Sequence, residues 1–518
     1  MIQREVVKAN LVVFISSFCT LVIELVAGRI MAPYVGVSLY TWTSIIGVVL
    51  AGISIGAYLG GLIADRFPRP STLGWLLLLS GLGSLSISPL INLLGESEFP
   101  TSLIVRILLM TAFIFLIPSC LLGMISPLVV KLTLKKLKKT GNVVGKIYAF
   151  STLGSIIGTF ATGFYLIQWM GTRHLLLAIG VILILCAPVF GGSFLKKRVF
   201  LLFLLSLVLL LGNFYGEAFK PPLDEETFYF KESNYYTIRL KKNVLNKEAS
   251  SVTLLLDHLT HSCTDLKDPF HLEYYYIRAF EEVLRWQADG EKPFSVLFVG
   301  GGGYTLPRFV ELKYPKAKIE VLEIDPEITR TAQAYLNLPR NTKIRTFNED
   351  ARWFVMNSKE KERYDFLFLD AFNDLSVPYH LTTKEFAMQL KILLKPHGLL
   401  LTNVIDNFSK GAFLPSYIRT LEEVFGKGYV HLISISPFNE LIATSNFIVV
   451  ASLQKIDLDD FVRKIKKTEN KEMTSYVIPQ DRLQQYLKKS YSVILTDDYV
   501  PVDNFTAPLF EETYGYQR

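Results

Sequence analysis

Long apolar runs dominate the first 216 residues of the chain. A helix needs about 20 residues to span the hydrocarbon core of a bilayer. The runs that approach or exceed this length lie at residues 11–32, 41–63, 72–94, 103–130, 147–170, 174–192 and 199–215, and the last is the shortest. The first run contains Glu24 and Arg29 and has no small-residue cleavage site, so we expect it to be retained rather than removed as a signal peptide. The pattern predicts a multi-pass transmembrane domain over residues 1–216.

Small residues recur on one face of two of these runs. Gly52, Gly56 and Gly60 are spaced four apart, and Gly154 and Gly158 repeat the spacing. Lipid gives helices no hydrophobic drive to associate, so transmembrane helices often approach each other closely at small residues. The spacing therefore predicts tight helix packing at both places.

Charge divides the chain at the same point. Residues 1–216 hold 16 Lys and Arg against 5 Asp and Glu, whereas the whole chain carries +7. The basic residues lie between the apolar runs, chiefly at 131–146 and 196–198, where cytoplasmic loops concentrate them. We therefore assign the positive charge to a membrane surface and expect the lipid bilayer, not nucleic acid, as the partner of this half.

Beyond residue 216 the pattern becomes that of a folded α/β protein. A segment with two prolines comes first and predicts a linker. Alternating stretches at 227–243 and 251–262 predict a small antiparallel sheet. Strands and helices then alternate, which is typical of a doubly wound parallel sheet. We expect a linker and small β subdomain over 217–285 and a Rossmann-like domain over 286–518.

The strands of the parallel sheet are predicted from short apolar runs with helical segments between them. They are expected at 295–299, 319–324, 343–347, 365–369 and 399–404. Two later apolar runs, 429–435 and 446–452, are expected to complete the sheet as edge strands.

Glycine and acidic residues stand at the ends of the first four strands. Gly300 to Gly303 follow the first strand, Glu323 the second, Asp350 the third and Asp370 the fourth. Open α/β sheets bind ligands at the carboxyl ends of their strands. A glycine run lets a ligand approach the backbone, and an acidic residue about 20 positions later accepts the ribose hydroxyls. The order predicts a site for an adenosyl nucleoside.

Several segments together resemble the spermidine synthase (polyamine aminopropyltransferase) family: GGGGYTLPR, VLEIDP, EDAR, YDFLFLDAFND and LTTKEF. The resemblance covers roughly residues 228–452, and the whole chain looks like members in which a multi-helix membrane domain precedes the synthase domain. It implies a methyltransferase-type Rossmann-like fold. It also implies transfer of an aminopropyl group from decarboxylated S-adenosylmethionine to a diamine such as putrescine, giving spermidine and methylthioadenosine, with no cofactor besides that co-substrate.

The resemblance implies roles for individual residues. Asp370 would be the catalytic base, and the amine would be bound by Asp374, His261 and Tyr276. Glycines, aromatic residues and carboxylates around the strand ends would bind the nucleoside. These are Gly300, Gly301, Gly302, Tyr304, Glu323 on the ribose, Asp325, Asp350 and Ala351 at the adenine, and Pro378 in the loop that closes over the site.

The chain departs from the family pattern at three places. Soluble members have an Asp after the third glycine, where it contacts the amine of the nucleoside, and this chain has Gly303. His261 stands where soluble members have Gln. Asp374 follows Asp370 by four positions, where soluble members have a spacing of three. The choice of nucleoside and the amine contacts are therefore open.

The residue types suit the implied chemistry. A protonated amine cannot attack carbon, so a base must take a proton before the nitrogen displaces the sulfonium. Aromatic faces favour a nearby cation. Asp370 and Asp374, with Tyr304, Phe372 and Tyr379 nearby in the sequence, provide both types.

Two other functions use the same features. A methyltransferase shares the fold and the ribose carboxylate, and the loss of an Asp at Gly303 removes one reason to exclude intact S-adenosylmethionine. A membrane polyamine sensor or transporter with a regulatory nucleoside domain is the third hypothesis, although such a domain needs no base at Asp370.

The scattered histidines predict no metal site. By analogy with soluble relatives, a homo-oligomer is possible.

Two arguments about sidedness conflict. The loop charges place the amino terminus in the cytoplasm, and seven full spans would then put the synthase domain outside. Decarboxylated S-adenosylmethionine is made in the cytosol, where the enzyme must meet it. We therefore expect that one run, such as 199–215, lies in the interface without spanning. The chain is expected to be a multi-pass protein of the cell (inner) membrane with its catalytic domain in the cytoplasm.

Overall fold

The computed structural model describes residues 2–95, 102–134, 140–192, 223–242, 251–288, 290–371, 377–437, 444–468 and 473–514. The chain divides into two compact units. One contains Met1–Asp224 with Glu232–Tyr236 and Tyr514–Arg518, and the other contains Glu225–Lys231 and Thr237–Thr513. The first unit is mainly helical and the second is α/β.

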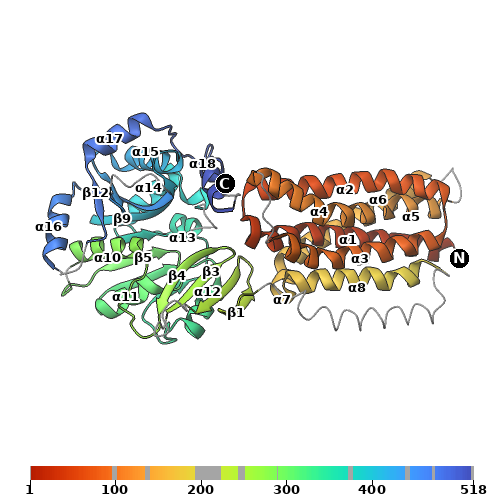
Figure 1. Ribbon diagram of the computed structural model, residues 1–518, viewed down its shortest axis with the longest axis horizontal. Coiled ribbons are helices and arrows are strands. Elements are labelled where there is room, and N and C mark those ends of the chain that lie inside the picture. The colour runs from red at the N-terminus through yellow and green to blue at the C-terminus, as the bar shows by residue number, and fades with distance from the viewer. Residues whose placement is uncertain are drawn as a thin grey trace. The chain divides into compact units, whose positions relative to one another are not determined.

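Long helices lie side by side in the first unit (Figure 1). The helices are α1 (Ile2–Val35), α2 (Leu39–Arg66), α3 (Pro70–Gly95), α4 (Leu103–Gly123), α5 (Ile125–Thr133), α6 (Thr140–Ala161), η2 (Thr162–Leu166), α7 (Ile167–Met170) and α8 (Thr172–Phe190). Within the described part of the chain, 6 segments are long and apolar enough to cross a membrane. They are Val6–Val35, Leu39–Arg66, Pro70–Gly95, Leu103–Thr133, Thr140–Met170 and Thr172–Phe190. The seventh run, 199–215, lies outside the described residues, so the number of spans and the sidedness stay predictions.

Both glycine rows pack against the backbone of a neighbouring helix. A Cβ on Gly56 would lie 2.1 Å from the carbonyl oxygen of Cys120 in α4. One on Gly154 would lie 2.2 Å from the carbonyl oxygen of Phe14 in α1. Side chains do not fit at these distances, so α2 meets α4, and α6 meets α1, at a separation that requires glycine. The tight packing predicted from the glycine spacing is confirmed.

The second unit begins with the predicted small antiparallel sheet. Its strands follow one another in sequence order and are β1 (Thr227–Glu232), β2 (Thr237–Lys242), β3 (Ser251–Leu256) and β4 (Leu259–Asp265). The turn between β3 and β4 is tight, because Asp257 takes a left-handed conformation with φ of 52°. Asp is one of the few residues that tolerate this region.

The main sheet has 8 strands in the order β12-β10-β11-β9-β8-β5-β6-β7. They are β5 (Ser295–Val299), β6 (Lys318–Leu322), β7 (Arg345–Phe347), β8 (Tyr364–Leu369), β9 (Leu394–Asn407), β10 (Val430–Ser434), β11 (Thr444–Ser452) and β12 (Tyr476–Ile478). The strands from β9 to β7 are parallel, as predicted. β11, β10 and β12 join antiparallel to their neighbours, so the sheet is mixed.

The prediction that residues 429–435 and 446–452 form edge strands is wrong. β11 lies between β9 and β10, and β10 lies between β11 and β12. Every residue of β10 is buried, as expected for an internal strand covered on both faces. The true edge, β12, has only 3 residues. A strand this short shows no periodicity that a sequence reading could detect.

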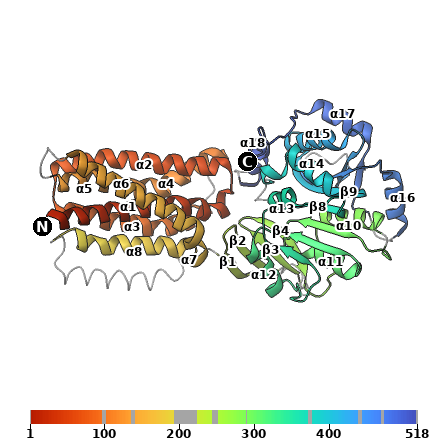
Figure 2. The same ribbon diagram turned by 180° about the vertical axis from the view of Figure 1, so that it is seen from behind.

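Helices cover both faces of the main sheet (Figures 1 and 2). On one face lie α10 (Tyr275–Gln287), α11 (Thr305–Lys313) and α12 (Pro326–Tyr335); on the other lie α13 (Ala351–Asn357), α14 (Lys384–Leu393) and α15 (Phe413–Phe425). The remaining elements are η3 (Tyr379–Leu381), α16 (Leu458–Thr468), α17 (Gln480–Lys489) and α18 (Val502–Tyr514).

Side chains alternate between the two faces of the sheet. Phe368 of β8 points to the α10 face, where its ring centroid lies 5.0 Å from that of Phe280 in an edge-to-face contact. Leu367 and Leu369 belong to the buried cluster of the other face, with apolar residues of α14 and α15. Because both faces are covered, β5 and the second half of β8 are mainly apolar, and Gly300 and Asp370 follow them at the carboxyl ends.

Candidate active site

The glycine loop lies where β5 ends beside β8. Gly300 has a φ of 97°, and a Cβ there would lie 2.3 Å from the carbonyl oxygen of Asp370. Both the backbone conformation and the space require glycine. Gly302 also has a positive φ, 48°. The loop therefore presents bare backbone at the carboxyl ends of β5 and β8, next to the residue predicted to be the base.

Glu323, directly after β6, stabilises this loop through hydrogen bonds. Its side chain is 5% exposed. One carboxylate oxygen, Oε2, accepts a hydrogen bond from the Gly301 N–H at 2.9 Å, and Oε1 accepts one from the Asp325 N–H at 2.9 Å. Burial raises the pKa of Glu323 to about 7, although these backbone donors pull it the other way. The carboxylate predicted for the ribose is thus also part of the loop's own support.

Two residues predicted to contact the nucleoside have other roles. Tyr304 is 1% exposed, and its hydroxyl lies 2.8 Å from Thr329 Oγ1 and 3.2 Å from Thr346 Oγ1. Its ring lies beneath the loop and supports it. Asp325 is 1% exposed and caps α12, because its Oδ1 accepts the Glu327 N–H at 2.9 Å. Both side chains are thus buried and hydrogen-bonded within the protein, and their assignment to the nucleoside stays a prediction.

Asp350 and Ala351, predicted at the adenine, begin α13. Asp350 Oδ1 accepts the Trp353 N–H at 2.9 Å, which makes Asp350 the N-cap of the helix. Its Oδ2 lies 2.9 Å from Nε2 of His380, which the sequence analysis did not identify. His380 lies in the short η3 turn that Pro378 starts. The carboxylate therefore joins α13 to the segment predicted to close over the site.

Arg352 fixes that segment further. Its guanidinium donates to the carbonyl oxygen of His380 at 2.7 Å and to Thr383 Oγ1 at 3.0 Å. It also forms a two-point ion pair with Asp497, one contact of which, to Oδ1, measures 2.8 Å. A planar guanidinium suits this geometry. The segment around residue 497, for which the sequence analysis predicts no role, is thus tied through Arg352 to the start of α13 and to His380.

Asp370 lies at the end of β8 with a hydrogen-bond donor on each oxygen. The Tyr276 hydroxyl donates to Oδ2 at 3.1 Å, and the Asn403 amide donates to Oδ1 at 2.9 Å. Burial raises the pKa of Asp370, and the two donors oppose this shift. Burial and the Asp370 charge raise the pKa of Tyr276 well above its ordinary value, so Tyr276 remains a donor. The arrangement is a buried carboxylate ready to accept a proton.

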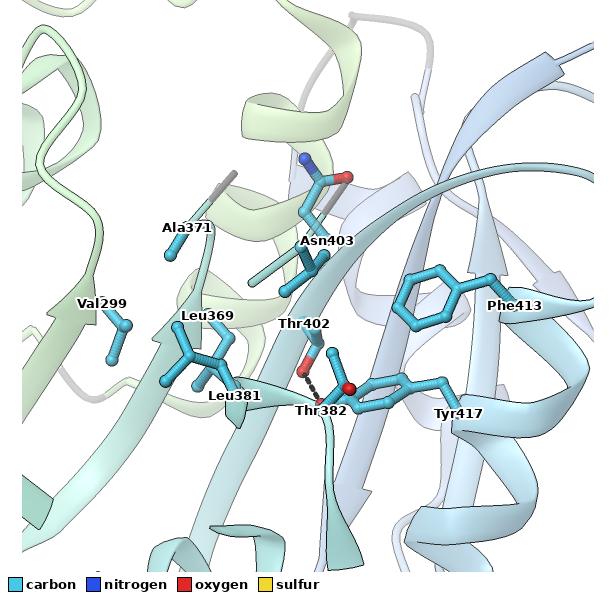
Figure 3. A pocket seen from close by; sticks show the side chains of 10 residues that line it. Val299, Leu369, Ala371, Leu381, Thr382, Thr402, Asn403, Phe413 and Tyr417 are labelled. Atoms are coloured by element: carbon cyan, nitrogen blue, oxygen red, sulfur yellow. Dashed lines mark hydrogen bonds between the residues drawn. The ribbon is translucent and has the colours of Figure 1, made fainter. Parts of the chain in front are cut away.

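A small cavity lies next to the Asp370 strand end, on the α15 side of β9. Figure 3 shows Asn403 at one end of this cavity, with Thr402 and Tyr417 hydrogen-bonded to each other at another. Their hydroxyl oxygens are 3.1 Å apart. The lining is mainly apolar and comprises Val299, Leu369, Ala371, Val377, Leu381, Thr382, Thr402, Asn403, Phe413 and Tyr417.

Of the residues predicted for the amine, Tyr276 contacts Asp370, and Asp374 lies outside the described residues. His261 of β4 lies with Nδ1 3.0 Å from the Leu259 carbonyl oxygen. Burial lowers the pKa of His261 to about 4, so its ring is neutral at physiological pH. Tyr274 stacks on Tyr276 with their ring centroids 6.1 Å apart. Two stacked aromatic rings therefore lie beside Asp370, and aromatic faces favour a nearby cation.

The packing of β4 explains the glycine at position 303. A Cβ on Gly303 would lie 2.2 Å from Ser262 Oγ and 3.2 Å from Thr264 Oγ1. The small sheet therefore fills the space that a side chain would need. An Asp at this place, as in soluble members of the family that the sequence resembles, does not fit unless the side chains of Ser262 and Thr264 move.

We expect Gly303→Ala to destabilise the α/β unit by about 1–3 kcal/mol, the usual cost of overpacking. Ser262→Gly in the same chain removes the clashing atoms and should recover most of the loss. Thermal unfolding of the two single variants and the double variant tests this. Additive losses would show that Ser262 does not determine the glycine.

Residues 287–458 match the spermine/spermidine synthase domain. A polyamine aminopropyltransferase from Vibrio vulnificus is 34% identical over 139 residues, which cover 27% of this chain and 46% of that protein. Polyamine aminopropyltransferase 2 from Aquifex aeolicus is 27% identical over 266 residues, which cover 50% of this chain and 48% of that protein. The chain thus spans about half the length of these curated relatives.

The chain is also similar in part to a solved structure. A probable spermidine synthase from Corynebacterium glutamicum aligns with 53% of this chain and 96% of its own, at 20% identity and a TM-score of 0.45.

Proposed function

We propose that this chain, whose residues 287–458 belong to the spermine/spermidine synthase family, transfers an aminopropyl group from decarboxylated S-adenosylmethionine to a diamine such as putrescine. The observation that carries the proposal is the Asp370 carboxylate. It lies at the end of β8 beside the glycine loop, with Tyr276 and Asn403 donating to its two oxygens. A nucleoside held by that loop would have its sulfonium close to a proton acceptor.

The proposed reaction is a single displacement. The amine loses a proton to Asp370, and its nitrogen lone pair then forms a bond to the methylene carbon next to the sulfonium. The carbon–sulfur bond breaks, its electron pair stays on sulfur, and methylthioadenosine leaves as a neutral molecule. Asp370 serves as the general base. The stacked rings of Tyr274 and Tyr276 favour the cationic amine before deprotonation.

Product identification tests the proposal. The purified full-length protein is incubated with a panel of diamines and either decarboxylated or intact S-adenosylmethionine, and the products are identified by mass spectrometry. We expect equimolar spermidine-type product and methylthioadenosine from the decarboxylated nucleoside. A methylated product from the intact nucleoside would instead support a methyltransferase, because Gly303 stands where an Asp would select the decarboxylated nucleoside. Nucleoside binding without turnover would favour a sensor or transporter.

The affinity for methylthioadenosine is expected to depend on pH through Glu323. Burial raises the pKa of this carboxyl to about 7 in the free protein, whereas ribose hydroxyls donate to the ionised form. Affinity should therefore be highest above pH 7 and fall by up to about tenfold per unit below it, because a proton must leave before the ribose binds. Calorimetry from pH 5.5 to 8.5 measures this. A flat profile would contradict the ribose assignment.

The membrane part completes the proposal. We assign residues 1–216 to a transmembrane domain, 217–285 to the linker and small β subdomain, and 286–518 to the catalytic domain. The catalytic domain is expected to face the cytoplasm, because its co-substrate is made there. A reporter that is active only in the cytoplasm should therefore be active when it is fused after Arg518. Activity in the periplasm alone would contradict this sidedness and favour a transport-linked function.

A further inference from the structure

An amide chain leads from β11 to the carboxylate of Asp370. Asn446 of β11 donates from Nδ2 to Oδ1 of Asn403 at 3.0 Å, and Asn403 of β9 donates from Nδ2 to Oδ1 of Asp370 at 2.9 Å. Asn403 is 2% exposed. The strands that carry the two asparagines are paired, with Asn403 opposite Ile448 and Asn446 opposite Ile405. The amides therefore sit diagonally across two hydrogen-bonded strands, on a rigid part of the sheet.

The chemistry of the three side chains determines the direction of these hydrogen bonds. An ionised carboxylate only accepts hydrogen bonds, so the atom of Asn403 that faces Asp370 must be its nitrogen. The Asn403 oxygen then faces Asn446 and needs a donor, which the Asn446 amide nitrogen provides. If Asn403 were turned over, its oxygen would face the carboxylate and its nitrogen would face another nitrogen. In the orientation observed, Asn446 donates to the Asn403 oxygen and so favours the Asn403 orientation that donates to Asp370.

We infer that Asn403, oriented by Asn446, is a positioning residue that holds Asp370 in the ionised, proton-accepting form. The inference rests on the proposed function and adds two residues to it. Burial works against the ionised form of Asp370, and each donor works for it. Among the described residues that pack on the carboxylate, the titratable donor is Tyr276 from α10, and β9 contributes the uncharged Asn403. The two hydrogen-bond donors therefore oppose the effect of burial, which disfavours the ionised form of Asp370.

The test is the pH profile of kcat/KM, whose acid limb reports the base of the free enzyme. Asn446→Leu removes the donor without adding charge, and we expect the acid limb to move to higher pH. Asn446→Asp also turns the Asn403 amide over and adds a negative charge, so its shift should be larger, about one pH unit or more. In both variants the rate should return toward that of the wild type at high pH.

Asn407→Ala is the matched control. Asn407 lies on the same strand and is 4% exposed, but its side chain accepts from the N–H groups of Ser409 and Lys410 and does not reach Asp370. This variant should lose stability and keep the wild-type acid limb. If the role of Asn446 were purely structural, its variants would lower kcat/KM by the same factor at every pH. If the acid limb moved in Asn446→Asp but not in Asn446→Leu, the shift would come from the added negative charge alone. Either result would overturn the inference.

The outcome is separable from that of the proposed function. If the wild-type protein forms no aminopropylated product with any diamine, the proposed function fails before the variants are compared. If the wild type is active and binds methylthioadenosine as tightly as the Asn446 variants do, an unshifted acid limb refutes only the role of the asparagine pair.

Discussion

Asp370→Asn should abolish turnover and leave methylthioadenosine binding nearly unchanged. Loss of a general base costs about 10²- to 10⁴-fold in rate. The Asn side chain suits the site, because its oxygen can accept from Asn403 while its nitrogen donates to the Tyr276 hydroxyl, which is free to reverse its role. The hydrogen-bond network therefore survives, and only the proton acceptor is removed.

The measurement pairs turnover by mass spectrometry with nucleoside affinity by calorimetry. Replacing a buried ionised carboxylate by a neutral amide should leave the melting temperature unchanged or raise it, because burial disfavours the charge. Tyr276→Phe provides the comparison: it removes one donor but keeps the base, so its loss of rate should be smaller and its acid limb should move to higher pH. More than half of the wild-type activity in Asp370→Asn would exclude Asp370 as the base.

The parallel half of the fold was predictable because each strand carries its own signal. An apolar run of 5 residues from Ser295 to Val299 ends in glycine, and the structure makes it β5 over the same residues. The arrangement of the antiparallel strands depends on contacts between residues that are far apart in the sequence. Whether β10 is an edge strand is decided by β12, 42 residues after the end of β10, and nothing within β10 itself shows that a partner exists. Local patterns predict strands better than they predict neighbours.

The candidate site shows the same division. Glycines and carboxylates at strand ends, such as Gly300 and Glu323, are recognisable because chemistry and position coincide in a short segment. Asn403 and Asn446 are 43 residues apart, and Arg352 and Asp497 are 145 apart. None of these polar residues stands in a local sequence pattern that indicates its partner, and only the fold brings each pair into contact. The burial of Tyr304 could not be predicted for the same reason: it stands next to the glycine loop in sequence, but its hydroxyl lies beside Thr329 and Thr346, which come from distant segments.

Glu323→Gln should weaken methylthioadenosine binding by about 1.5–3 kcal/mol, the scale of a hydrogen bond to a charged group. The change also affects the loop itself. Both oxygens of Glu323 accept backbone N–H groups, from Gly301 and Asp325, and Gln has only one oxygen. Its NH₂ group would face an N–H that then has no acceptor, and that costs about 1–3 kcal/mol of stability. The KM for the nucleoside should rise more than that for the amine.

Binding is best measured at pH 8, where the wild-type carboxyl, with its pKa raised to about 7, is ionised. Glu311→Gln is the matched control, because Glu311 accepts from Thr342 Oγ1 and the Lys343 N–H and does not touch the glycine loop. It should cost stability without changing nucleoside affinity. Equal affinity in the wild type and in Glu323→Gln would mean that the carboxylate supports the loop only, and that the ribose is held by other groups.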